Sequence, residues 1–156
     1  MMSGTTDVHQ PSKEIRNRYE FCSLFLVKGF IPYHPEYDTG VDFMLYREED
    51  DLFIKVQLKS RWTVDRKYLG RNIWIAFPNQ ERNLQQWYLA PHDRMVEHGR
   101  NSHGNTSSWK DGLYHKTPLP QAWLQLYEEF RVENIISMCT KDKLDSWLQS
   151  KETSWY

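Results

Sequence analysis

The amino-acid sequence predicts an α/β fold with a mixed central β-sheet of four to five strands flanked by helices. Three observations predict it: a helical pattern opens the chain, several short strand patterns follow, and helical patterns return near the end. This order favours helices packed on a sheet over two sheets packed on each other. The 156 residues, 39% of them hydrophobic, are enough for one domain with an ordinary core.

The composition excludes several classes of protein. A formal net charge of −1 argues against a polycation that coats nucleic acid, but it leaves local basic patches open. The sequence has no run of about 20 apolar residues that could cross a bilayer, and its polar N-terminus lacks a signal-peptide pattern. We therefore expect a cytoplasmic protein with no membrane partner. Of the two cysteines, Cys22 is expected to be a buried free thiol.

The first expected helix begins after Ser12, a good N-cap residue, and runs to about Lys28, where Gly29 ends it. Residues 1–11 are expected to form a flexible tail. Four residues recur at helical spacing and predict the apolar face of this helix: Ile15, Tyr19, Cys22 and Leu26.

Five strand patterns follow the helix. Alternation and short apolar runs predict strands at Phe30–Tyr33, Val41–Tyr46, Leu52–Lys59, Asn72–Phe77 and Trp87–Ala90. The turn signal Asp38-Thr39-Gly40 precedes the second strand, and the acidic run 48–51 is expected to be a solvated hairpin connection to the third. Alternation in the third strand predicts that Gln57 and Lys59 emerge on the same face.

The rest of the chain predicts helices and one long loop. A short helix is expected over 91–98, a loop over 99–112, a helix over 120–131, and a last short helix over 141–149 that begins after Thr140. The chain then divides into a core over residues 12–98 and a C-terminal part over 99–156. We expect that C-terminal part to consist of a loop and helices that pack on the core or form a subunit interface.

One grouping of polar residues suggests chemistry. If the second and third strands pair, Asp42 lies close to Gln57 and Lys59. The Asp42 carboxylate, the Gln57 amide oxygen and the backbone carbonyl of Leu58 are oxygen ligands of the kind that Mg²⁺ prefers. A metal ion there polarises a phosphate and activates water, while Lys59 orients the nucleophile and stabilises developing charge.

These residues resemble the PD-(D/E)XK nuclease superfamily, whose members share a restriction-endonuclease-like fold. Asp38-Thr39-Gly40-Val41-Asp42, followed by Val56-Gln57-Leu58-Lys59-Ser60-Arg61, carries the resemblance, which covers residues 12–90. The motif's proline is absent, and Gln57 stands where most members have Asp or Glu, which makes this a Q-x-K variant. By the same resemblance, Glu20, ahead of Gly29-Phe30, is a further catalytic and metal-binding residue.

The resemblance implies an Mg²⁺-dependent endonuclease, with Mn²⁺ as a substitute ion, that hydrolyses double-stranded DNA at specific sites. The layout is similar to the short homing endonucleases associated with introns. Restriction and junction-resolving roles are not separated from it by the sequence. A chain with one site usually pairs subunits to cut both strands, so a homodimer or homotetramer is expected. The loss of a carboxylate at Gln57 favours the alternative of a catalytically inactive nucleic-acid-binding module, and a structural or regulatory protein without a DNA role is a third option.

A basic segment, residues 61–71, follows Lys59, and we expect it to be an exposed loop. Its cations could neutralise phosphates flanking the cut, and its aromatic rings could pack on sugar or base. A polar loop over 101–110 is a second candidate for DNA contact. The residues expected to bind DNA are Arg61, Trp62, Arg66, Lys67, Tyr68, Arg71 and Lys110.

Overall fold

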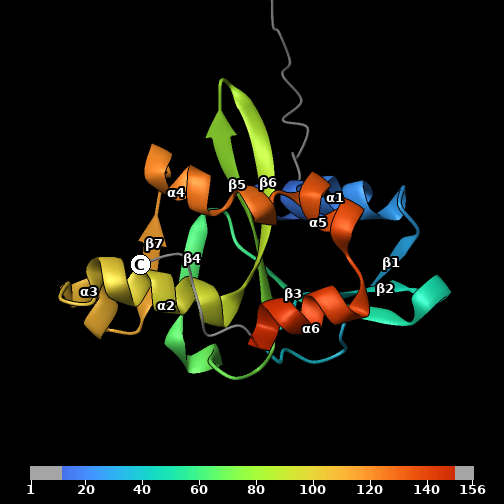
Figure 1. Ribbon diagram of the computed structural model, residues 1–156, viewed down its shortest axis with the longest axis horizontal. Coiled ribbons are helices and arrows are strands. Elements are labelled where there is room, and N and C mark those ends of the chain that lie inside the picture. Colours follow the sequence, from blue (N-terminus) through green and yellow to red (C-terminus); the bar gives the residue numbers. More distant parts are fainter. Residues whose placement is uncertain (1–11, 150–156) are drawn as a thin grey trace, which may run out of the picture.

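The computed structural model describes residues 12–149, and the expected tail over residues 1–11 lies outside them. The fold is α/β, with a mixed five-stranded sheet, a second sheet of two strands, and helices around both (Figure 1). The predicted fold class is therefore confirmed at this level. Within the described residues, no helix is both long and apolar enough to cross a membrane.

The large sheet has the strand order β1-β2-β3-β5-β6. Its strands are β1 (Phe30–Tyr33), β2 (Phe43–Arg47), β3 (Leu52–Leu58), β5 (Trp74–Glu81) and β6 (Leu84–Pro91). Only the β3–β5 pair in this sheet is parallel, and the others are antiparallel. As predicted, the acidic run connects β2 and β3, with a 3-10 turn η1 at Glu48–Asp50. This hairpin brings the start of β2 beside the end of β3.

The β5–β6 hairpin is longer than predicted at both strands. Its turn consists of Arg82 and Asn83, which both have positive φ angles (53° and 63°), as tight hairpin turns require. The amide-rich sequence over 79–86 lacks the apolar alternation of a strand, which explains why the sequence did not reveal its ends. The far end of this hairpin projects from the body of the molecule in Figure 1.

Helix α1 (Lys13–Leu26) begins as predicted, because the Ser12 side chain accepts a hydrogen bond from the Ile15 N–H. Its predicted apolar face is largely wrong. Tyr19 is 73% exposed, and Ile15 and Leu26 are exposed as well, whereas the side chains that pack inward are Asn17, Phe21, Cys22 and Phe25. Aromatic packing decides this orientation, since Phe21 contacts Phe43 on β2 and Trp87 on β6 at centroid distances of 5.8 and 5.4 Å.

The prediction that Cys22 is a buried free thiol is confirmed. Burial raises the pKa of Cys22 to about 11, with a smaller opposing effect from Arg18. The thiol is therefore protonated at neutral pH and is a poor nucleophile.

The second sheet was not predicted. Strands β4 (Trp62–Asp65) and β7 (Leu113–Lys116) pair antiparallel; β4 falls in the segment that was expected to be an exposed loop, and no element was predicted over β7. The expected loop over 99–112 is wrong as well, because α2 (His92–His103) continues through Gly99 and α3 follows at Ser107–Lys110. Gly99 does not end the helix; its missing side chain makes room for Trp109 and Trp62, which would lie 2.7 and 3.1 Å from a Cβ atom there.

The C-terminal part consists of short helices. The helix expected over 120–131 is interrupted, giving α4 (Gln121–Leu126), a 3-10 turn η3 (Glu128–Phe130) and then α5 (Val132–Met138). Helix α6 (Lys141–Gln149) is confirmed, with the Thr140 hydroxyl accepting from the Lys143 N–H. Trp147 of α6 is buried against Trp74 and Phe130, so α6 packs on the protein's own core.

Helix α2 carries a buried histidine, His98, which packs against Trp62 of the small sheet. His98 is 3% exposed; its Nδ1 lies 3.0 Å from the Tyr127 hydroxyl, and its ring contacts Trp123 and Trp62. Burial, and to a lesser degree the charge of His103, lowers the pKa of His98 to about 4. The imidazole is therefore neutral in the folded protein at neutral pH.

Stability is expected to depend on pH through His98. Because its pKa falls from an ordinary value of 6.5 to about 4, the unfolded chain takes up the proton first as the pH drops. The free energy of unfolding should fall across that range, by up to about 1.4 kcal/mol per pH unit. Urea unfolding at pH 7 and pH 5 should show a smaller decrease for His98→Gln than for the wild type. Equal decreases in the two proteins would contradict this role.

Candidate active site

Asp42 lies directly before β2, at the entrance to the hairpin that β2 forms with β3. Its backbone N–H donates to the Val56 carbonyl (2.9 Å), and its carboxylate Oδ2 accepts from the Leu58 N–H at 2.6 Å. A short, charge-assisted bond of this kind fixes the carboxylate against the end of β3. The predicted proximity of Asp42 to the third strand is therefore confirmed, although β2 begins at Phe43 rather than at Val41.

Gln57 is almost buried, with 5% of its surface exposed. Its amide Nε2 donates to the Gly40 carbonyl at 3.0 Å, while its Oε1 is buried and has no hydrogen-bond partner among the described residues. Exchanging the amide oxygen and nitrogen would set two oxygens against each other, so the network determines this orientation. A buried acceptor without a donor is costly, and this one retains its full capacity to accept a hydrogen bond or to bind a cation.

The backbone at the end of β3 adds a third oxygen, the Leu58 carbonyl, to those of Asp42 and Gln57. In an extended strand the N–H and C=O of one residue point to the same side, so the Leu58 carbonyl is directed toward the side of Asp42. Lys59 is held by its own N–H, which donates to the Ala76 carbonyl of β5 at 2.8 Å. Its half-buried side chain forms no salt bridge or hydrogen bond with other described residues.

Glu20 lies elsewhere. Its carboxylate accepts hydrogen bonds from Gln85 Nε2 (3.0 Å) and Trp87 Nε1 (3.1 Å), both on β6. Strand β6 is separated from β3 by β5, and neighbouring strands lie about 4.8 Å apart. The same inward packing of Phe21 that overturned the predicted helix face turns Glu20 toward β6. We therefore leave Glu20 out of the candidate site.

The turn that carries Asp42 is held from outside by the basic segment. Gly40 has a φ of +83°, and a Cβ atom there would lie 2.5 Å from the Tyr68 ring. Arg71 lies beside the same ring and donates to the Thr39 carbonyl at 3.2 Å. Tyr68 and Arg71, which the sequence assigned to DNA contact, thus help to shape the candidate site.

Substitution of Gly40 should test this packing. Gly40→Ala adds a left-handed backbone penalty of about 1–2 kcal/mol and a clash with Tyr68. Gly70→Ala is the matched control, because Gly70 has nearly the same φ (+80°) but open space around it. Chemical denaturation should show Gly40→Ala to be the less stable variant by about 1–3 kcal/mol. If both variants lose the same free energy of unfolding, the Tyr68 ring moves aside without an energetic penalty, and the packing argument is wrong.

The structure corrects one predicted DNA contact. Trp62 is 1% exposed and donates from Nε1 to the Tyr127 hydroxyl at 2.9 Å, so stacking on a base is excluded. The expected exposed loop is in fact β4 followed by a 3-10 turn η2 at Arg66–Tyr68, and β4 buries its apolar side chains.

The basic residues of the segment 61–71 differ in how strongly other groups of the protein bind their side chains. Arg66 donates to the Lys110 carbonyl at 2.9 Å and lies over the Trp109 ring, which brings Arg66 and Lys110 together. Lys67 is exposed and pairs loosely with Asp65 at 3.6 Å. Arg61 is exposed and makes no salt bridge with the described residues.

Sequence reasoning missed two residues of the small sheet. Thr63 on β4 lies opposite His115 on β7, and Thr63 Oγ1 is 3.0 Å from His115 Nδ1. Partial burial lowers the pKa of His115, and the charges of Arg61 and Lys59 lower it further. The signal that could have revealed this pair is the short alternating segment Leu113–Lys116 after Gly112, which is typical of a strand.

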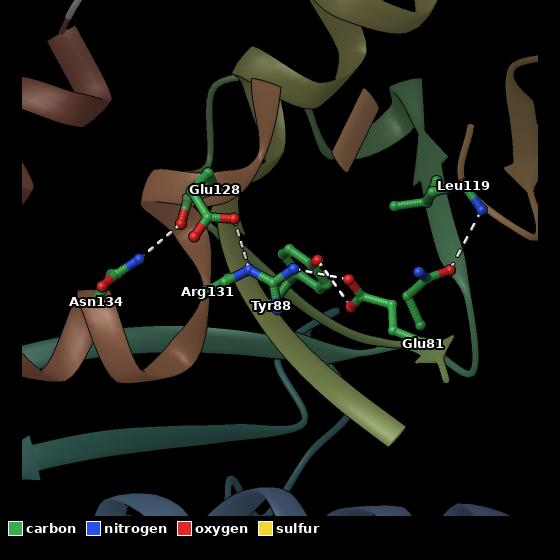
Figure 2. Close-up of polar contacts among 7 residues, drawn as sticks. Glu81, Tyr88, Leu119, Glu128, Arg131 and Asn134 are labelled. Atoms are coloured by element: carbon green, nitrogen blue, oxygen red, sulfur yellow. Dashed lines mark hydrogen bonds and ion pairs between the residues drawn. The ribbon is translucent and has the colours of Figure 1, made fainter. Parts of the chain in front are cut away.

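A second polar cluster lies away from these residues, between the β5–β6 hairpin and the α4–η3 segment, where a cleft of about 870 Å³ opens. Figure 2 shows Arg131 between Glu81 and Glu128, to which it donates at 2.7 Å in each case, while the Tyr88 hydroxyl donates to Glu81. The guanidinium of Arg131 is paired with both carboxylates. We therefore infer that the cluster stabilises the β5–β6 hairpin and is not a reactive site.

The residues present are compatible with a divalent cation. Among the described residues no group of three or more His, Cys, Asp or Glu side chains could hold a metal ion, so a cation would rely on fewer carboxylates. The end of β3 offers one carboxylate, from Asp42, one open amide oxygen, from Gln57, and the Leu58 carbonyl. Oxygen donors of this mixed kind suit Mg²⁺, which usually takes one or two carboxylates and retains several waters.

Comparison of the chain with protein-family models, with curated proteins and with solved structures finds no match. The functional argument therefore depends on the geometry of the chain itself.

Proposed function

We propose that the protein is a metal-dependent endonuclease that hydrolyses phosphodiester bonds of double-stranded DNA at specific sites, with a restriction-endonuclease-like fold of the PD-(D/E)XK type. One observation carries the proposal: Gln57 Oε1 is buried without a partner among the described residues, the Asp42 carboxylate is bound by the N–H of the next residue, Leu58, and Lys59 directly follows β3. An oxygen kept free in a buried site is costly unless it binds a ligand.

The chemistry follows from these groups. A divalent cation held by Asp42, Gln57 and the Leu58 carbonyl would supply the charge that polarises a phosphate and acidifies water. Asp42 is oriented for this role by the Leu58 N–H, and Gln57 by the Gly40 carbonyl. The ammonium group of Lys59 has no competing partner among the described residues and stabilises the charge that develops on the phosphate. Mg²⁺ is the ion proposed, and Mn²⁺ can replace it.

A homodimer or homotetramer is part of the proposal, since enzymes with one site per chain usually pair subunits to cut both strands. A homing or a restriction role fits equally well.

The alternative is a catalytically inactive nucleic-acid-binding module with the same fold. The position of Glu20 favours it, because with Glu20 bound to β6 the candidate site has Asp42 as its one carboxylate. A cation in such a site binds more weakly than one held by two carboxylates.

Cleavage of supercoiled plasmid separates these functions. Wild-type protein with Mg²⁺ or Mn²⁺ should nick or linearise the plasmid, and EDTA should stop the reaction. Asp42→Asn should be inactive while retaining its affinity for DNA. DNA binding without cleavage by the wild type would support the inactive module, and failure to bind DNA at low salt would overturn both functions.

The basic residues after β3 should contribute phosphate contacts. Arg61→Ala and Lys67→Ala each remove an exposed cation, and each should flatten the slope of log affinity against log salt concentration by about 0.9. Lys28→Ala, which removes an exposed cation just after α1, serves as the control and should leave the slope unchanged. Unaltered slopes in both test variants would remove this segment from the DNA interface.

A further inference from the structure

The small sheet holds a histidine, His115, that feels the charges of Lys59 and Arg61. Strand β4 begins three residues after Lys59, and its Thr63 is directly opposite His115 of β7. Thr63 is 3% exposed, whereas the His115 side chain is exposed. A buried hydroxyl thus anchors one edge of an imidazole whose other edge faces solvent.

The two contacts of the Thr63 hydroxyl favour one tautomer of the His115 imidazole. The Thr63 hydroxyl has one proton, and it donates this proton to the Arg61 carbonyl at 3.0 Å. With the imidazole as donor in the 3.0 Å contact between Thr63 Oγ1 and His115 Nδ1, both contacts of the hydroxyl are satisfied at once, and this is the assignment we adopt. In the neutral ring, Nδ1 is then protonated and Nε2 carries the free lone pair. This orientation resembles that of any catalytic base held by a partner at its other nitrogen.

The charges around His115 favour that neutral form. Partial burial lowers its pKa, and Arg61 and Lys59 lower it further, since their positive charges oppose a third. The same two cations attract a phosphate. His115 therefore presents an unprotonated nitrogen where Lys59 and Arg61 would hold the substrate's anionic group.

We propose that His115 is the general base of the hydrolysis, with Nε2 accepting the proton of the attacking water. This inference rests on the proposed endonuclease function. The water oxygen forms a bond to phosphorus, and its proton passes to Nε2. The bond between phosphorus and the leaving sugar oxygen breaks, and that oxygen takes a proton from solvent. The imidazolium then returns its proton to solvent. Thr63 is a positioning residue, because it acts only by fixing the Nδ1-protonated tautomer.

The test compares the pH dependence of DNA cleavage in variants. The wild-type rate should rise with pH through a pKa below 6.5, the ordinary value for histidine, and then level off. His115→Ala should cleave at least about 100-fold more slowly, should lose that rise, and should regain activity when imidazole is added. His34→Ala, which removes another exposed histidine, is the matched control and should cleave like the wild type.

A second measurement does not depend on activity. Nuclear magnetic resonance of the ¹⁵N-labelled imidazole should show the Nδ1-protonated tautomer in the wild type, and a mixture shifted toward the Nε2-protonated form in Thr63→Val. A His115→Ala variant that cleaves within a few-fold of the wild type would overturn the inference, as would an Nε2-protonated ring in the wild type. If Lys59→Ala is inactive and His115→Ala is active, the endonuclease function stands and this inference alone fails. If the wild type does not cleave, both fail.

Discussion

Lys59→Ala is expected to cleave DNA at least about 100-fold more slowly than the wild type in Mg²⁺, while binding DNA nearly as well. Removing one preorganised group that stabilises the transition state typically costs this much in rate. The fold should survive, because the Lys59 side chain is half-buried and makes no salt bridge or hydrogen bond with the described residues. Single-turnover cleavage and a binding isotherm, measured on the same protein, separate the loss of chemistry from the loss of affinity.

Lys28→Ala is the matched control for charge, since it removes one cation just after α1. It should cleave at the wild-type rate. If Lys59→Ala cleaves DNA at a rate within a few-fold of the wild type, the catalytic site is not at the end of β3.

Substitutions of Gln57 are expected to give the second large effect. Gln57→Leu removes the open Oε1 and also leaves the buried Gly40 carbonyl without its donor, at a cost of about 1–3 kcal/mol. This variant should lose metal-dependent cleavage. Gln57→Glu sets a carboxylate oxygen against the Gly40 carbonyl, so the metal-free variant should be less stable than the wild type.

Metal should reverse the defect of Gln57→Glu. A hard cation prefers an anionic oxygen, so Mg²⁺ should raise the melting temperature of Gln57→Glu more than that of the wild type. It should not raise that of Gln57→Leu. Thermal unfolding at a series of Mg²⁺ concentrations measures all three proteins. If Gln57→Leu responds to Mg²⁺ as the wild type does, Gln57 is not a ligand.

Much of the large sheet was predictable because its strands alternate. In β3, Leu52, Ile54 and Val56 are buried while Phe53 is exposed, which is the pattern that the sequence shows. The face of α1 was not predictable from the same reasoning. Apolar residues occur all around that helix, and only the contacts of Phe21 with Phe43 and Trp87 decide which of them face inward.

The small sheet escaped prediction for a related reason. Its strands have four residues each and contain charged or polar side chains, so the alternation over Leu113–Lys116 is the one local signal, and it is too short to decide without the partner strand β4. Gly99, which is usually a sign of a helix end, is required here inside α2 by the two tryptophans that pack against it.

In the candidate site, too, contacts between neighbouring strands were predictable and contacts between distant segments were not. The proximity of Asp42 to β3 followed from a hairpin whose length the sequence fixes, and the structure confirms it. The partners of Glu20, Trp62 and His115 lie 67, 65 and 52 residues away in the chain, where no local pattern reaches them.

The most direct test of the metal site is anomalous X-ray scattering from crystals of the protein with a DNA duplex and Mn²⁺. We expect a manganese peak at about 2.0–2.3 Å from an Asp42 carboxylate oxygen, from Gln57 Oε1 and from the Leu58 carbonyl oxygen. The peak should be absent from crystals of Asp42→Asn grown in the same way. A peak at another site, or none at the end of β3 in the wild type, would contradict the account.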